Sequence, residues 1–172
     1  GILNHENIEV RLNCAFEELD EVFRHVFYSG PLDQYFHCDL GRLGYRTLDF
    51  EEIRAKGDLQ GTAVMNYPDE DVPYTRISEH KHFAPWESAG FERTIAFREY
   101  SRACGPNDVP YYPIRLVNDK KLLDDYEARA AQEKGVTFIG RLGTYQYLDM
   151  DVTIERALDS AKSFLEKNPP RI

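Results

Sequence analysis

The sequence predicts an α+β fold, in which a mainly antiparallel β-sheet lobe is flanked by strand and helix pieces of an α/β unit. Across residues 44–114, short runs of alternating apolar and polar residues are separated by turns rich in Gly, Pro and Asp. This pattern is typical of antiparallel strands with one solvated face. Two helical patterns follow that region, and short apolar runs at residues 25–28 and 136–139 lie on either side of it.

The strands are expected in the following order. Residues 8–12 alternate apolar and charged side chains and predict a short, half-buried strand. Residues 25–28 predict a buried strand that ends at the Gly30-Pro31 break. Within the lobe, strands are expected at residues 45–50, 61–67, 75–80 and 93–100.

Two helices are expected after the lobe. Asn118 is the expected N-cap of the first, and Gly135 is its stop. Its apolar face comprises Leu122, Leu123, Tyr126 and Ala130. The second helix covers residues 152–166 and ends at Pro169-Pro170, and its apolar face comprises Ile154, Leu158, Ala161 and Leu165.

We divide the chain at residues 40 and 117. Residues 1–40 supply strand and connection pieces of the α/β unit, residues 41–117 form the sheet lobe, and residues 118–172 return to the α/β unit. A sheet built only from the outer pieces would expose its edges, so we expect partner strands from elsewhere.

Composition limits the classes of function. The formal net charge of −9 argues against nonspecific nucleic-acid binding, which needs a basic face. No apolar run approaches the roughly 20 residues of a membrane span. The three cysteines lack C-x-x-C and zinc spacing, which favours free thiols and a cytoplasmic setting. His80 and His82 lack a third metal ligand at a usual spacing, so we expect a polar strand end there and no metal.

Residues 140–151 predict a ligand loop. An apolar run ends in glycine, and the loop then carries one arginine, two tyrosines and two aspartates before a helix begins. Helix N-termini present unpaired N–H groups and a partial positive charge, which suit anionic or electron-rich ligand atoms. The loop therefore predicts a flat or phosphorylated ligand.

Three further segments accompany this loop: residues 28–36 (Tyr-Ser-Gly-Pro-Leu-Asp-Gln-Tyr-Phe), residues 72–81 (Val-Pro-Tyr-Thr-Arg-Ile-Ser-Glu-His-Lys), and residues 99–104 with 110–115. Together the four segments resemble the UDP-galactopyranose mutase family of flavoenzymes, in order and over nearly the whole chain. The family's Gly-rich dinucleotide-binding turn does not occur, because Gly41-Arg-Leu-Gly44 lacks its spacing. The resemblance implies an incomplete FAD-binding α/β domain, whose partner is the missing N-terminal part of the same enzyme.

The resemblance also implies a substrate, UDP-galactose, and a redox-neutral ring contraction that uses reduced FAD. It places the diphosphate on Arg76, Tyr112 and Tyr147, and the sugar beside Arg46 and Asn66. Guanidinium offers phosphate a rigid fork, and a phenol donates to phosphate without adding charge. From the residues alone, the alternatives are surface arginines, packed tyrosines and a turn asparagine before Pro68.

The resemblance assigns the flavin to the ligand loop, namely Arg141 and the 148–151 backbone, including Leu148, Asp149 and Met150. Arg76 and Asp149 are the candidate catalytic residues. Simple N-capping is the alternative role of Asp149 and is compatible with flavin binding.

We expect the isolated chain to be catalytically inactive and to bind FAD weakly or not at all. One alternative is a standalone nucleotide-sugar binding or oligomerisation module, and another is half of a split enzyme. Unpaired strands at residues 26–28 and 136–139 would favour a fragment that forms a homo-oligomer or aggregates through them.

Overall fold

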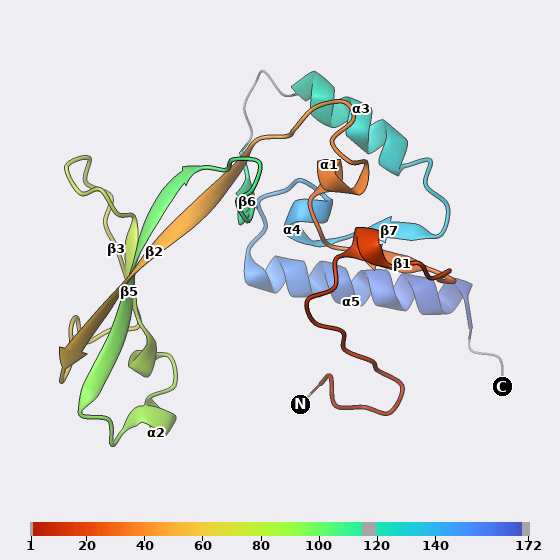
Figure 1. Cartoon of the computed structure of the whole chain (residues 1–172). Helices are drawn as coiled ribbons and strands as arrows, with labels where there is room; N and C mark the ends of the chain where they lie inside the picture. The colour runs from red at the N-terminus through yellow and green to blue at the C-terminus, as the bar shows by residue number, and fades with distance from the viewer. Residues whose placement is uncertain (1, 115–119, 170–172) are drawn as a thin grey trace.

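The computed structural model describes residues 2–114 and 120–169 and has an α+β fold with two sheets. The elements are η1 (Phe16–Glu18), β1 (Val26–Tyr28), α1 (Leu32–Tyr35), β2 (Tyr45–Lys56), β3 (Val64–Asn66), β4 (Arg76–Glu79), η2 (His80–His82), α2 (Pro85–Ser88), β5 (Arg93–Ala103), β6 (Tyr112–Pro113), α3 (Lys120–Ala130), β7 (Val136–Phe138), α4 (Gly140–Gly143) and α5 (Met150–Lys167). Figure 1 shows the larger sheet projecting away from α1, α3, α4 and α5, with the smaller sheet among these helices. No helix in these two described ranges is long and apolar enough to cross a membrane.

The larger sheet is antiparallel, with strand order β3-β4-β5-β2-β6. Its longest strand pairing is the β2–β5 ladder, which runs from the Arg46↔Ala103 pair to the Lys56↔Arg93 pair. Both strands are longer than expected, because the backbone pairing continues where the apolar alternation stops. Glu51 and Arg98 face each other in this ladder and form an ion pair of 3.2 Å.

The larger sheet does not have the single solvated face that the sequence predicts. The middle of β2 is exposed on both faces, since Phe50 and Glu51 are neighbours pointing in opposite directions and both are exposed. In Figure 1 no helix lies along this part of the ribbon. The central strands are therefore held mainly by backbone pairing and by side-chain contacts across the ladder.

The smaller sheet pairs β1 with β7 in parallel, from Val26↔Val136 to Tyr28↔Phe138. The strands expected at residues 25–28 and 136–139 are thus confirmed, and they pair with each other. The Tyr35 ring of α1 packs against Tyr28 and Phe138, whereas Phe164 of α5 packs against Phe27. Of the β1 residues only Tyr28 is buried, so this strand is less buried than predicted.

The core lies between α1, α3 and the start of β2, and it comprises Leu32, Phe36, Leu43, Tyr45, Tyr126 and Tyr145. Asp33, which is 1% exposed, brings a carboxylate into this region. Its oxygens accept hydrogen bonds from the Leu43 N–H (3.0 Å) and the Tyr45 hydroxyl (2.9 Å). A buried charge is tolerated only with such partners, so Asp33 ties α1 to the first residue of β2.

The strand predicted at residues 8–12 is wrong. These residues have no strand pairing in the part of the chain that the structure describes, and Leu12 is 81% exposed. Arg11 instead forms ion pairs with Glu9 and Glu21. The alternation of charged side chains therefore reflects a solvated segment, because the apolar positions Ile8, Val10 and Leu12 are exposed.

The two expected helices are confirmed as α3 and α5, with different degrees of burial. Tyr126 of α3 is fully buried, and Leu122 and Leu123 pack beside it. On α5, by contrast, the predicted apolar face is exposed, including Ile154, Leu158 and Leu165. The expected N-cap Asn118, together with Arg115 and Pro170, lies outside the described residues.

Two leucine-to-alanine substitutions distinguish the packed core from the exposed face of α5. We expect Leu32→Ala to lower the free energy of unfolding by about 3 kcal/mol, because it leaves a cavity around a side chain that is 1% exposed. Leu158→Ala, on the 66% exposed position of α5, should change it by less than about 0.5 kcal/mol. Urea denaturation measures both values, and a large loss with Leu158→Ala would show that this face of α5 is covered.

Candidate functional site

Four of the predicted substrate residues lie on one face of the larger sheet. Directly paired residues in an antiparallel ladder share a face, as do residues two apart along a strand. Asn66 pairs with Arg76, and Arg76 pairs with Glu99 on β5. Arg46 pairs with both Tyr112 and Ala103, and Ala103 lies four residues from Glu99 on β5. The register therefore gathers side chains from five strands on a single surface.

At the β3–β4 side of this face, Arg76 is held by two neighbours. Its Nε donates to Asn66 Oδ1 at 3.0 Å, and its Nη1 lies 3.8 Å from Glu99 Oε2. The Arg76 side chain remains 46% exposed. Asn66 thus acts on Arg76 directly, a contact that the sequence did not predict.

At the β6 side, Arg46 and Tyr112 meet at Ser101 of β5. Arg46 Nε donates to Ser101 Oγ at 2.9 Å, and Arg46 Nη2 donates to the Ser101 carbonyl at 2.7 Å. The Ser101 and Tyr112 hydroxyls are 2.9 Å apart and share a hydrogen bond. A guanidinium and a phenol are therefore anchored on one serine.

The ligand loop reaches this group from the helical part of the chain. The ring of Tyr147 lies edge-on to the ring of Tyr112, with centroids 5.8 Å apart. The Arg141 guanidinium lies 4.8 Å from the centre of the Tyr147 ring, in a cation–π contact. Arg141 also donates from Nε and Nη2 to the carbonyl of the buried Leu148. The predicted loop residues and the sheet residues thus adjoin at Tyr112.

The N-terminus of α5 follows this loop directly. Asp149 occupies the N-cap position with extended backbone, but its carboxylate makes no capping hydrogen bond. Its carbonyl accepts from both the N–H and the hydroxyl of Thr153. Asp149 and Met150 are exposed, so the first N–H groups of the helix and one carboxylate are open to a ligand.

The candidate residues form two groups on the sheet rather than one. The Asn66–Arg76–Glu99 row and the Arg46–Ala103 row are four residues apart along β5, roughly 13 Å at about 3.3 Å per residue. This is a separation along the backbone of β5, so a ligand that contacts both groups has to lie between the Arg76 and Tyr112 side chains.

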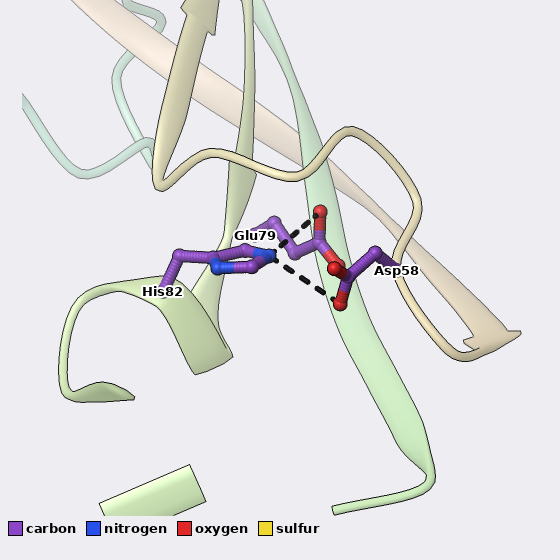
Figure 2. Close-up of side chains that lie close together, drawn as sticks. All are labelled: Asp58, Glu79 and His82. Atoms are coloured by element: carbon purple, nitrogen blue, oxygen red, sulfur yellow. Dashed lines mark ion pairs between the residues drawn. The ribbon is translucent and has the colours of Figure 1, made fainter. Parts of the chain in front are cut away.

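A separate cluster of titratable groups lies at the far end of the larger sheet (Figure 2). Glu79 is fully buried, and His82 Nε2 lies 3.6 Å from its Oε2 and 3.5 Å from Asp58 Oδ1. His80, the other histidine that the sequence singled out, packs instead against the ring of Phe97.

The contacts of this cluster favour a structural ion-pair network over a metal centre. Glu79 Oε1 accepts from the Leu59 N–H and the Thr94 hydroxyl, and Oε2 accepts from the N–H groups of Gln60 and Gly61. These four bonds use the lone pairs that a metal would need. The Lys81 ammonium also lies 2.5 Å from Asp58 Oδ1, where it would oppose a second cation.

Sequence reasoning missed Ser101, Glu99 and Asp58. Glu99 and Ser101 lie in the 99–104 segment, and their spacing of two residues is the signal that both share a face. Asp58 carries no comparable signal, because it approaches His82 only through the loop after β2.

Comparisons with known proteins agree with the resemblance drawn from the sequence. A family model described as UDP-galactopyranose mutase matches residues 1–147. A probable UDP-galactopyranose mutase of Klebsiella pneumoniae is 58% identical over 166 residues, which are 96% of this chain and 43% of the relative. A dTDP-fucopyranose mutase of Escherichia coli is 46% identical over 98% of this chain and 46% of its own length.

A more distant relative is a UDP-galactopyranose mutase of Mycoplasma pneumoniae, which is 32% identical over 96% of this chain and 45% of its own length. The chain thus spans less than half the length of the curated relatives that it matches.

Glu79 should make stability depend on acidic pH. Burial alone would raise the pKa of its carboxyl, but the hydrogen bonds from Thr94 and the 59–61 backbone outweigh burial and lower the pKa to about 2. Since this lies below the ordinary value of 4.5, the stabilisation is complete above pH 4.5 and is lost as the pH falls toward 2.

We expect Glu79→Gln to lower the free energy of unfolding by about 3 kcal/mol at neutral pH, since an amide cannot accept all four bonds. Denaturation from pH 7 to pH 2.5 should give a flatter pH profile for this variant, and the exposed Glu92→Gln serves as the control. Parallel profiles for Glu79→Gln and the wild type would contradict this role of Glu79.

Proposed function

Because the chain belongs to the UDP-galactopyranose mutase family, we propose that it supplies the nucleotide-sugar face and the flavin-edge loop of an isomerase. The reaction proposed is the interconversion of UDP-galactopyranose and UDP-galactofuranose. The observation that carries the proposal is the shared sheet face of Arg46, Asn66, Arg76 and Tyr112, which adjoins Tyr147.

In the proposed site, Arg76, Tyr112 and Tyr147 bind the diphosphate. The exposed Arg76 fork is oriented by Asn66 and Glu99, so its remaining N–H groups can reach two phosphate oxygens. As the diphosphate departs, negative charge builds on it, and a guanidinium already fixed in place stabilises that charge without reorganising. This is the catalytic role proposed for Arg76.

Arg46 and Asn66 are proposed to orient the sugar. Arg46 uses two N–H groups on Ser101 and retains others for hydroxyl groups of a ligand. The Asn66 amide oxygen accepts from Arg76, so its NH₂ group is the part left to donate to the sugar. Both residues would fix the anomeric carbon relative to the flavin.

The loop residues Arg141, Leu148, Asp149 and Met150 fit an electron-rich ring edge. The open N–H groups at the start of α5 and the nearby guanidinium favour negative charge there. When bound in its reduced form, FAD supplies the electron-rich nitrogen that reacts at the anomeric carbon. Asp149, the second proposed catalytic residue, presents its uncapped carboxylate at the same end of the helix.

The names of the relatives bear on which sugar and which base the proposed substrate carries. One relative is named for UDP-galactopyranose and another for dTDP-fucopyranose, and both names describe a nucleotide diphosphate sugar. The higher identity to the first, 58% against 46%, favours UDP-galactose.

We further propose that the chain by itself is inactive, and that the rest of a longer enzyme completes the site. The exposed positions of Tyr147 (62%) and Met150 (81%) support this, because catalysis needs a site closed to water. The exposed α5 face supports either such a partner segment or a homo-oligomer. The three free cysteines support a cytoplasmic setting.

UDP binding tests the diphosphate assignment. We expect UDP to bind the chain with a Kd of about 1 mM, and Arg76→Ala to weaken binding at least about tenfold, because the guanidinium makes charge-assisted bonds. Calorimetry or a heteronuclear NMR titration measures both constants.

Arg54→Ala is the matched control for this titration. Arg54 is also exposed and paired with a glutamate, but it lies four residues beyond Phe50, the β2 residue in the Arg76–Glu99 row, roughly 13 Å away on the side opposite Arg46. Equal UDP affinity for Arg76→Ala and Arg54→Ala would remove Arg76 from the site.

The proposed inactivity has its own test. Purified chain should show no flavin absorption band and no turnover of UDP-galactofuranose with added reduced FAD, because the proposal places part of the cofactor-binding surface in the rest of a longer enzyme. A stoichiometric flavin band, or turnover lost on Arg141→Ala, would contradict the proposal.

A further inference from the structure

We propose that Ser101 is a positioning residue. Its hydroxyl links Arg46 to the Tyr112 hydroxyl through hydrogen bonds, so that the guanidinium polarises Tyr112 and strengthens it as a donor to the diphosphate. This inference rests on the proposed function, since it needs an anionic ligand at Tyr112. It gives a role to Ser101, which the proposed function does not use.

Ser101 lies between Arg46 and Tyr112. Its Oγ lies 2.9 Å from Arg46 Nε and 2.9 Å from the Tyr112 hydroxyl, and it is the atom common to both bonds. The Ser101 carbonyl holds Arg46 a second time, through Nη2 at 2.7 Å. Because Ser101 lies two residues from Ala103 on β5, it faces the same side of the sheet as Arg46.

The donor and acceptor roles of the three side chains set the direction of these hydrogen bonds. Arg46 Nε can only donate, so Ser101 Oγ accepts that bond and keeps one hydrogen of its own. When an anion approaches Tyr112, the phenol must turn its hydrogen toward the anion. The Ser101 hydroxyl can then donate to the Tyr112 oxygen, which gives the ordered series Arg46 to Ser101 to Tyr112 to ligand.

This series of hydrogen bonds would strengthen the binding of an anionic ligand. In a series of aligned hydrogen bonds each donor polarises the next, and a guanidinium at the start adds positive charge. Without the serine hydroxyl, Tyr112 could still touch the ligand but would lose the bond that orients its oxygen. Arg46 would retain only its bond to the Ser101 carbonyl. Ser101 therefore acts through Tyr112 and Arg46 and need not touch the ligand.

A double-mutant cycle in the 172-residue chain tests the coupling, with UDP as the probe and NMR titration as the measurement. We expect Ser101→Ala to weaken UDP binding about threefold and Tyr112→Phe about fivefold, each reflecting the loss of roughly one hydrogen bond. Together they should cost about fivefold, whereas independent effects would multiply to about fifteenfold.

Ser101→Thr and Ser101→Val form a second, isosteric pair that differs only in the hydroxyl and suits a β-strand. We expect Thr to bind UDP within about twofold of the wild type and Val to match Ser101→Ala. This pair keeps the inference testable if Ser101→Ala fails to fold. Ser78→Ala is the control, since Ser78 shares this sheet face and should leave binding unchanged.

The outcomes separate the two proposals. If the wild type binds no UDP, the proposed UDP binding by this chain fails and the role of Ser101 fails with it. If the wild type binds UDP but Ser101→Val binds equally well, or the effects of Ser101→Ala and Tyr112→Phe multiply, only the role of Ser101 is overturned.

Discussion

The register of β2 against β5 is the constraint on which the rest of the candidate site depends. A slip of one residue would turn Arg46 to the opposite face and bring Tyr45 out of the core. Contacts at the start of β2 prevent such a slip. The buried Asp33 carboxylate accepts from the Tyr45 hydroxyl, and the Tyr145 hydroxyl lies 2.6 Å from the Gly44 carbonyl. Burial of Tyr45 therefore decides where the side chain of its neighbour Arg46 points.

Buried carboxylates organise the chain at both ends of the larger sheet. Asp33 fixes the entry into β2, and Glu79 fixes the loop between β2 and β3 through three backbone N–H groups. Each is satisfied by hydrogen bonds, as a charge removed from water requires. Neither belongs to the candidate site, where the charged groups Arg76 and Asp149 are exposed. Charge thus has two separate uses in this molecule: buried charges hold the backbone, and exposed charges are left for a ligand.

The helical part of the molecule leaves apolar side chains exposed. A parallel strand pair usually lies within a larger sheet that is covered on both faces, whereas β1 and β7 pair only with each other in the described residues. The Ile154, Leu158 and Leu165 side chains of α5 are exposed beside them. The chain also spans less than half the length of its curated relatives. These three observations support the proposal that other segments of a longer protein complete this sheet and the flavin site.

The sequence by itself determined the α+β class, the strands of the lobe, the two long helices and the family, because these follow from local periodicity, turn residues and short motifs. Only the tertiary structure decided which periodic segments are buried. Residues 8–12 alternate like a strand and α5 has an apolar stripe, yet both are exposed, since burial requires a partner that local pattern does not reveal. The same holds for the site. Motifs named Arg46 and Tyr112 separately, but it is the strand register, a relation between residues far apart in the chain, that joins them through Ser101.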